Sequence, residues 1–123
     1  MRVTGRVVHG IGDFRKRMTT YADVFTRVVG HELFPGTLNV EIDGSLAVRE
    51  DFRIHGRDID EPEQDLLFER CRIFGRPAYR IRPYQLTTGE GGHGDHILEI
   101  ASREELRPLL VGHKGRVELE FFR

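Results

Sequence analysis

Two oxygen-bearing side chains lie two positions apart, directly after a predicted turn. Pro35 and Gly36 fit the central positions of a type II turn, and the alternating segment after them predicts a strand. On a strand, Thr37 and Asn39 project to one face while Leu38 points to the other. Two neutral oxygens side by side form a partial shell for a hard cation such as Mg²⁺, which nucleotide phosphates and water would complete. The alternative is a polar strand face that begins at a turn.

A glycine-rich turn, from Gly10 to Asp13, follows the first predicted strand. Glycine allows backbone N–H groups to approach an anion with no side chain in the way, so this turn could hold a phosphate. The cationic residues Arg15, Lys16 and Arg17 come next and would complement a polyphosphate. The alternatives are a tight turn between strands and a solvated run of charge. The sequence contains neither a P-loop nor the pattern G-x-G-x-x-G.

Strands must position most of these residues, because apolar and polar side chains alternate along much of the chain. The alternation predicts strands near residues 6–9, 38–42, 79–82, 97–101 and 117–121. We expect Pro83 to end the strand that contains Tyr79 and Ile81.

Two segments have helical spacing instead. Apolar residues from Tyr21 to Val28 recur on a single helical face, which predicts a helix. Thr20 and Asp23 have the form of a capping box, and Gly30 suits the left-handed position after the helix.

A second helix is predicted around residues 106–110, where Leu106, Leu109 and Leu110 form the apolar face. Ser102 and Glu105 resemble its capping box, and Pro108 limits it to one or two turns.

Two loops are also predicted, an acidic surface loop from Asp58 to Asp65 and a mobile glycine-rich loop from Gly89 to Gly94. Together these elements predict a mostly β fold with short α insertions, in one domain spanning residues 1–123.

The composition narrows the classes of partner. Lys and Arg number 19 against 20 Asp and Glu, and this balance disfavours nucleic acid as the main partner. No apolar run reaches the roughly 20 residues needed to span a bilayer, so we expect no membrane association. Cys71 is the only cysteine and no signal-peptide core follows Met1, which favours the cytoplasm. We expect a monomer.

In this order, the motifs resemble the archaeal-type CTP-dependent riboflavin kinase family. The segments that carry the resemblance are Gly5-Arg6-Val7-Val8-His9-Gly10-Ile11-Gly12, then Tyr21 through Gly30, Phe34-Pro35-Gly36-Thr37-Leu38-Asn39-Val40, Ile97-Leu98-Glu99-Ile100, Leu106-Arg107 and Lys114-Gly115. The part from about Ser45 to Arg82 resembles the family only in the alternating pattern that is typical of strands.

The resemblance implies a small six-stranded barrel of the cradle-loop type. It implies that Thr37 and Asn39 hold Mg²⁺, and that two segments contact the nucleotide. These nucleotide-binding residues would be Gly10, Ile11, Gly12, Asp13, Phe14, Arg15, Glu105, Leu106, Arg107 and Pro108.

For the acceptor, the resemblance implies that Glu99 contacts the flavin, and His93 lies in the segment aligned with a flavin-contacting region. The reaction would transfer the γ-phosphoryl group of CTP to the 5′-hydroxyl of riboflavin, giving FMN and CDP. Glu99 is an acidic candidate for the catalytic base, and burial there would raise its pKa. The alternative is an edge-strand carboxylate that faces water.

Two other functions fit such a barrel. One is a non-catalytic barrel that binds a flavin or a nucleotide, which the intact Thr37 and Asn39 pair opposes. The other is a regulatory DNA-binding barrel, which the near-zero net charge opposes.

Overall fold

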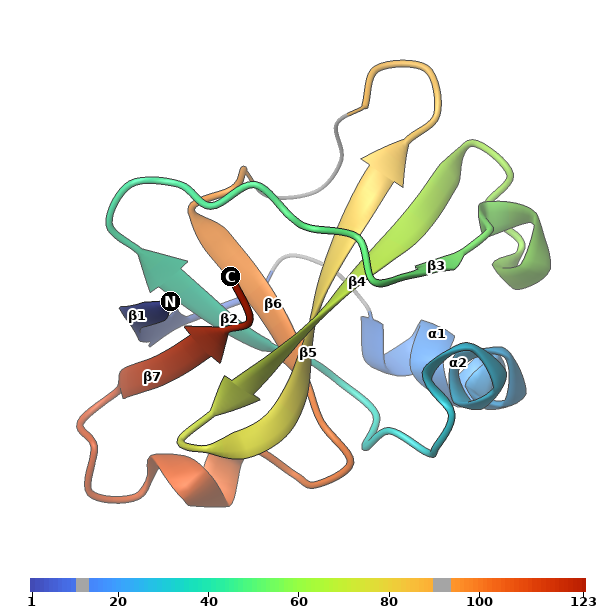
Figure 1. The fold of residues 1–123 in the computed structure, drawn as a ribbon. Helices are drawn as coiled ribbons and strands as arrows, with labels where there is room; N and C mark the ends of the chain where they lie inside the picture. The colour runs from blue at the N-terminus through green and yellow to red at the C-terminus, as the bar shows by residue number, and fades with distance from the viewer. Residues whose placement is uncertain (11–13, 90–93) are drawn as a thin grey trace.

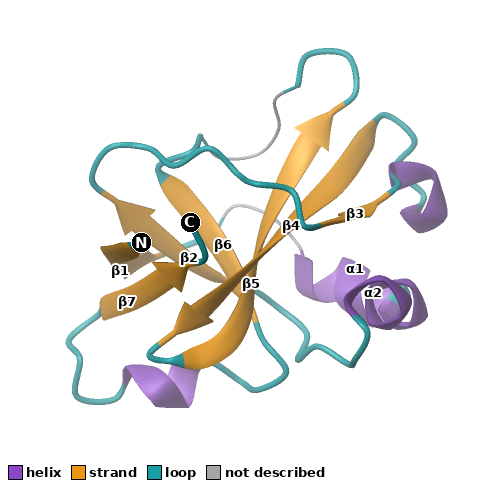
Figure 2. Cartoon of the chain, viewed as in Figure 1, coloured by secondary structure: helices purple, strands orange, loops and turns teal. Residues whose placement is uncertain are grey.

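The computed structural model describes residues 1–10, 14–89 and 94–123, which form an antiparallel β sheet with two short helices (Figure 1, Figure 2). The strands are β1 (Arg2–Val8), β2 (Leu38–Ile42), β3 (Phe52–Ile54), β4 (Gln64–Ile73), β5 (Arg76–Gln85), β6 (Ile97–Ala101) and β7 (Arg116–Phe121). The helices are α1 (Phe14–Thr20) and α2 (Ala22–Val29), and the 3₁₀ turns are η1 (Gly56–Ile59) and η2 (Arg107–Leu110). The predicted mostly β fold is confirmed.

The sheet closes on itself. Its strand order is β3-β4-β5-β6-β2-β1-β7, and β4 also pairs with β7, for example between Cys71 and Phe121. Six strands therefore form a ring, and β3 pairs with β4 outside it. The described residues thus contain seven strands, the six in the ring that the resemblance implies and the short β3 in addition. The alternation of apolar and polar residues predicted neither β3 nor β4.

One apolar cluster is drawn from all six strands of the ring. Leu98 and Ile100 of β6 lie in it with Val40 of β2, and all three side chains are fully buried. At a typical 1.5–3 kcal/mol for each buried aliphatic side chain, this cluster is a main source of stability. It holds β2 and β6 in fixed register, with Asn39 opposite Glu99.

A second apolar cluster joins both helices to the neighbouring strands. Phe25 of α2 packs edge-on against Phe68 of β4, with ring centroids 6.0 Å apart. Phe14 and Met18 of α1 and Ile81 of β5 belong to the same cluster. The helices accordingly lie together on one side of the sheet, beside β3 and β4 (Figure 1).

The helix predicted between Tyr21 and Val28 is present as α2, and Gly30 follows it with φ of 97°. The predicted capping box is wrong, because Tyr21 occupies the N-cap and makes no side-chain cap hydrogen bond. Helix α1 was not predicted. It consists largely of cationic and polar residues, and only Phe14 and Met18 are buried, which leaves a weak apolar pattern.

Pro83 does not end its strand, contrary to the prediction. Strand β5 continues to Gln85 and pairs with β4 along its whole length, whereas β6 pairs only with the part from Tyr79 to Ile81. Pro83 therefore lies where the edge towards β6 is already free, and its missing N–H removes no hydrogen bond there.

The segment from Asp58 to Asp65 is not simply an acidic surface loop. Asp65 begins the buried part of β4 and is only 4% exposed. Its carboxylate accepts hydrogen bonds from the Gly56 backbone N–H and from Arg53, both at 2.8 Å. These contacts fasten η1 to the start of β4.

The second predicted helix is the single turn η2, and its capping box is also wrong. Leu106 precedes η2 without a side-chain cap, while the Ser102 hydroxyl accepts a hydrogen bond from the Glu104 N–H at 3.2 Å. The predicted loop at Gly89 to Gly94 falls mostly on residues 90–93, outside the described residues. Within the described parts of the chain, no helix is long and apolar enough to cross a membrane.

Candidate active site

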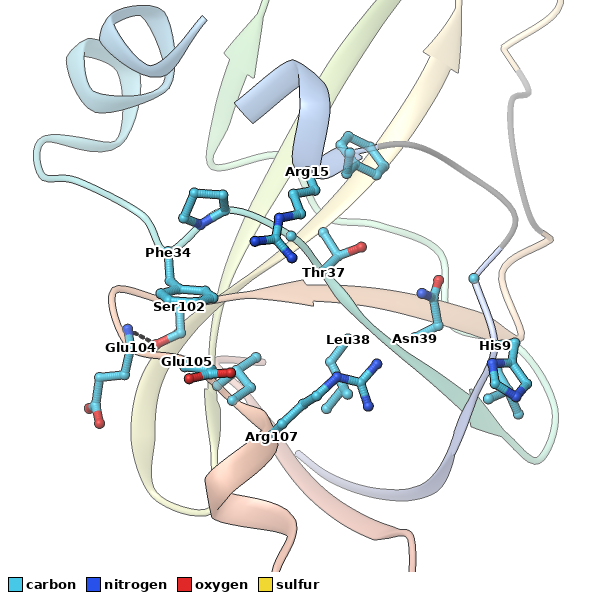
Figure 3. A pocket seen from close by; sticks show the side chains of 16 residues that line it. His9, Arg15, Phe34, Thr37, Leu38, Asn39, Ser102, Glu104, Glu105 and Arg107 are labelled. Carbon is cyan, nitrogen blue, oxygen red and sulfur yellow. Dashed lines mark hydrogen bonds between the residues drawn. The ribbon is translucent and has the colours of Figure 1, made fainter. Parts of the chain in front are cut away.

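A cavity of about 380 Å³ lies where β1 ends, β2 begins and the segment after β6 turns back (Figure 3). Asn39 and His9 lie towards one end, and Phe34 and Glu104 lie towards the other. Arg15 reaches in from α1, on the side of Thr37. The cavity is therefore elongated and lined by charged and polar groups.

The turn before β2 is built as predicted. Gly36 has φ of 112°, a left-handed conformation that glycine adopts without strain. Its N–H donates to the Met18 sulfur at 3.3 Å, so the turn is attached to α1. Thr37 and Asn39 both line the cavity, as their spacing on a strand requires.

Gly10 and Asn39 are fitted to each other. A methyl group at Gly10 would overlap the Asn39 side-chain amide, so the close approach requires glycine. Asn39 is 7% exposed, and within the described residues its Oδ1 is buried and lacks a hydrogen-bond partner. A buried acceptor without a partner costs free energy unless a ligand satisfies it.

The opposite end of the cavity is formed by the segment after β6. The Phe34 N–H donates to the Ser102 carbonyl at 2.8 Å, which fixes the two walls together. Phe34 is 40% exposed, a large fraction for an aromatic residue whose backbone is hydrogen-bonded to the opposite wall. Glu105 and Arg107 line this end, whereas the Glu104 carboxylate is bound by Arg76 at 2.8 Å.

Glu99 is buried, against the alternative that it faces water. It is 5% exposed and lies on β6 directly opposite Asn39. Burial raises the pKa of its carboxyl to about 7, against the opposing influence of Arg17, Arg82 and Arg80. Such a carboxyl exchanges its proton near neutral pH, as a catalytic base requires.

The structure brings most of the predicted nucleotide and metal residues into one cavity. They are Gly10, Phe14, Arg15, Thr37, Asn39, Glu105, Leu106 and Arg107. Pro108 lies in η2 and does not line the cavity, and Glu99 is next to it without lining it. Ile11, Gly12, Asp13 and His93 lie outside the described residues.

Sequence reasoning did not identify Phe34 and Ser102 as cavity residues. For Phe34 a signal existed, since an aromatic residue directly before the Pro-Gly turn must lie near whatever Thr37 and Asn39 bind. For Ser102 the sequence predicts a helix cap, whereas the structure places it in the cavity wall.

Comparison with known proteins identifies the class. The family model named for CTP-dependent riboflavin kinases, described as domain of unknown function DUF120, matches residues 7–120. The riboflavin kinase of Staphylothermus marinus is 30% identical over 113 residues, covering 89% of this chain and 82% of that protein. The riboflavin kinase of Methanopyrus kandleri is 32% identical, covering 94% of this chain and 80% of that protein.

A third relative is longer. The riboflavin kinase of Methanoculleus marisnigri is 41% identical over 125 residues, covering 96% of this chain but 56% of that protein. The chain belongs to the CTP-dependent riboflavin kinase family. The family and the enzyme class predicted from the sequence, a kinase acting on riboflavin, are thereby confirmed.

Proposed function

We propose that this chain transfers the γ-phosphoryl group of CTP to the ribityl 5′-hydroxyl of riboflavin, giving FMN and CDP. The observation that carries the proposal is the pairing of Asn39, in the cavity, with the buried Glu99 beside it. This pairing sets a neutral oxygen next to an acidic group that exchanges its proton near pH 7. Phosphoryl transfer depends mainly on positioning and charge neutralisation, and these residues suit both.

On the donor side, CTP would lie along the cavity with its two ends at different walls. The phosphates would lie at the end formed by Gly10 and Asn39, where backbone groups can approach them, and Arg15 would reach them from the side of Thr37. The nucleoside would lie towards Glu105 and Arg107. Pro108, in η2, would support this wall from behind. Ile11, Gly12, Asp13 and Phe14 complete the proposed nucleotide contacts from the sequence.

Thr37 and Asn39 fit a divalent cation such as Mg²⁺. Both are neutral oxygen donors on one face of the chain, and the Asn39 Oδ1 is the buried acceptor without a protein partner in the described residues. Mg²⁺, when bound, neutralises charge on the phosphate oxygens. Thr37 and Asn39 would hold it at the phosphate end of the cavity.

On the acceptor side, Glu99 would take the proton of the ribityl 5′-hydroxyl. The oxygen then forms a bond to the γ-phosphorus, and the bond between this phosphorus and the β–γ bridging oxygen breaks. FMN and CDP leave, and Glu99 returns its proton to water. Glu99 and His93 would also contact the flavin.

We further assign the six-stranded ring to the cradle-loop barrel type, and residues 1–123 to a single domain that works as a monomer in the cytoplasm. The ring closure between β4 and β7 supports the barrel. The near-zero net charge supports small-molecule substrates in preference to nucleic acid.

A labelling experiment tests the reaction itself. The purified chain is incubated with Mg²⁺, riboflavin and CTP that carries a γ-phosphorus label, and the flavins and nucleotides are separated. The proposal expects label in FMN, with unlabelled CDP formed in equal amount. Quenching of riboflavin fluorescence without any FMN would instead indicate a flavin-binding protein without turnover, and would overturn the proposal.

A further inference from the structure

Arg17 of α1 is a cationic residue that the scheme above does not use. Its guanidinium lies over the ring of Phe14, with the central carbon 5.2 Å from the ring centroid. The side chain is half-buried, and its Nη1 is buried without a hydrogen-bond partner in the described residues. A buried guanidinium donor without a partner is costly, because charged groups lose strong hydration on burial.

The position of Arg17 points to the place where the two substrates meet. Among the surrounding charges, that of Arg17 acts most strongly on the Glu99 carboxyl. Glu99 in turn lies opposite Asn39, on the same face of the sheet. Glu99 does not satisfy Arg17, since Nη1 remains without a hydrogen-bond partner beside it.

Two buried side-chain polar atoms in the described residues lack a hydrogen-bond partner, Arg17 Nη1 and Asn39 Oδ1. Their needs are opposite, because the guanidinium requires an anionic acceptor while the amide oxygen requires a donor or a cation. A phosphoryl group with its divalent cation satisfies both at once. Phe14 links the two sides, because it lines the cavity and carries the Arg17 guanidinium on its ring.

We propose that Arg17 binds the phosphoryl group in transit, first as the γ-phosphate of CTP and then as the phosphate of FMN. This inference rests on the proposed function. In this role Arg17 neutralises the charge that develops on the phosphoryl oxygens, for which the planar guanidinium is well suited. Arginines in other phosphoryl-transfer enzymes make the same electrostatic contribution.

The test compares ligands that differ by one phosphoryl group. Arg17→Met keeps the apolar stem over Phe14 but removes the charge, and Arg17→Lys keeps a cation without the fork of donors. Arg27→Gln is the matched control, because it removes one positive charge from an exposed position on the neighbouring helix α2, outside the cavity lining. Dissociation constants for riboflavin and FMN are measured by flavin fluorescence, and those for CTP and CDP by calorimetry in the presence of Mg²⁺.

In Arg17→Met we expect FMN to bind about tenfold more weakly, with riboflavin nearly unchanged, since a hydrogen bond to a charged group contributes a factor of this order. Binding of CTP should likewise weaken by a larger factor than binding of CDP. Arg17→Lys should recover part of both effects, and Arg27→Gln should show neither.

If Arg17→Met bound riboflavin and FMN more weakly by the same factor, Arg17 would only shape the flavin site, and the inference would be overturned. Unchanged binding of all four ligands would overturn it as well. Because these are binding measurements, they are independent of turnover. If the wild-type chain forms no FMN, the proposed reaction is refuted. If the wild-type chain forms FMN but Arg17→Met binds all four ligands as the wild type does, only the role of Arg17 is refuted.

Discussion

Asn39 on β2 and Glu99 on β6 face each other directly across two antiparallel strands, and both are almost fully buried. Partners in such a pair leave the sheet on the same face, so the two side chains are neighbours although 60 positions separate them in the chain. One belongs to the cavity proposed for the nucleotide and the other lies beside it. This relationship places the phosphate end of the donor next to the proposed base.

Asn39→Ala should abolish turnover without unfolding the protein. The lost Oδ1 has no hydrogen-bond partner in the described residues, so its removal should change the free energy of unfolding by less than about 1 kcal/mol. Turnover should fall about 100-fold or more if the residue holds the cation, because metal stabilisation of the transition state is worth several kcal/mol. Denaturant unfolding and the rate of FMN formation measure the two effects. Survival of most of the activity would show that the metal assignment is wrong.

The pH dependence of turnover should report Glu99. The base must be ionised, and burial raises its pKa to about 7, so kcat should rise with pH through this value. Glu99→Gln should remove most of the activity at every pH. A rate profile that is flat between pH 6 and pH 8, at saturating substrates, would exclude Glu99 as the base.

Glu99 should also make the stability of the ligand-free protein depend on pH. Its pKa is raised from the ordinary 4.5 to about 7 in the folded state, so the folded protein binds more protons between these values. Its contribution to stability is therefore fully present below about pH 4.5 and is lost as the pH rises through about 7. Glu99→Gln should stabilise the protein at pH 8, measured as a higher melting temperature. An unchanged or lower melting temperature at pH 8 would contradict the burial argument.

Two glycine substitutions should have opposite effects. Gly10→Ala should reduce activity with little loss of stability, because the added methyl group displaces the Asn39 amide. Gly112→Ala, outside the cavity lining, should lower stability by about 1 kcal/mol and leave activity intact, because its φ of 83° strains any residue with a Cβ. Melting curves and initial rates of both variants provide the comparison. Full activity in Gly10→Ala would refute the close fit between Gly10 and Asn39.

Asp65→Asn should destabilise the fold without altering catalysis directly. Burial alone would raise the pKa of this carboxyl, but the Gly56 N–H and Arg53 outweigh it and hold the pKa below its ordinary value. The stabilisation is thus present above the unfolded pKa and is lost as the pH falls through the lower folded value. We expect a loss of about 2 kcal/mol at pH 7 by denaturant unfolding. Asp58→Asn, an exposed control in the same segment, should change stability far less.

The sequence predicted the strands of the site well, because their residues alternate between a buried core and a polar face. Thr37 and Asn39 were found in this way, and so was the middle of β5 around Tyr79, although β5 extends further at both ends than predicted. Pairing between distant strands could not be predicted, since it depends on how the ring closes between β4 and β7. Asp65 was misplaced for a related reason, because its partner Arg53 belongs to another strand.

For Glu99, too, the sequence predicts the local structure but not the contacts with distant parts of the chain. Its position on an apolar strand could be read from the sequence, but its burial could not. Glu99 lies on β6 between β2 and β5, where it pairs with Asn39 and Ile81. The charge of Arg17 on α1 acts on the Glu99 carboxyl, and α1 has too few apolar residues to be predicted from spacing. The burial of an acidic residue is a property of the whole fold.

The initial rate of FMN formation with each of CTP, ATP, GTP and UTP tests both the proposed reaction and the choice of nucleotide. Riboflavin and Mg²⁺ are held constant, and Asn39→Ala is measured in parallel. We expect FMN from the wild-type chain, fastest with CTP, and almost none from the variant. No FMN with any of the four nucleotides, from a folded protein that binds riboflavin, would contradict it.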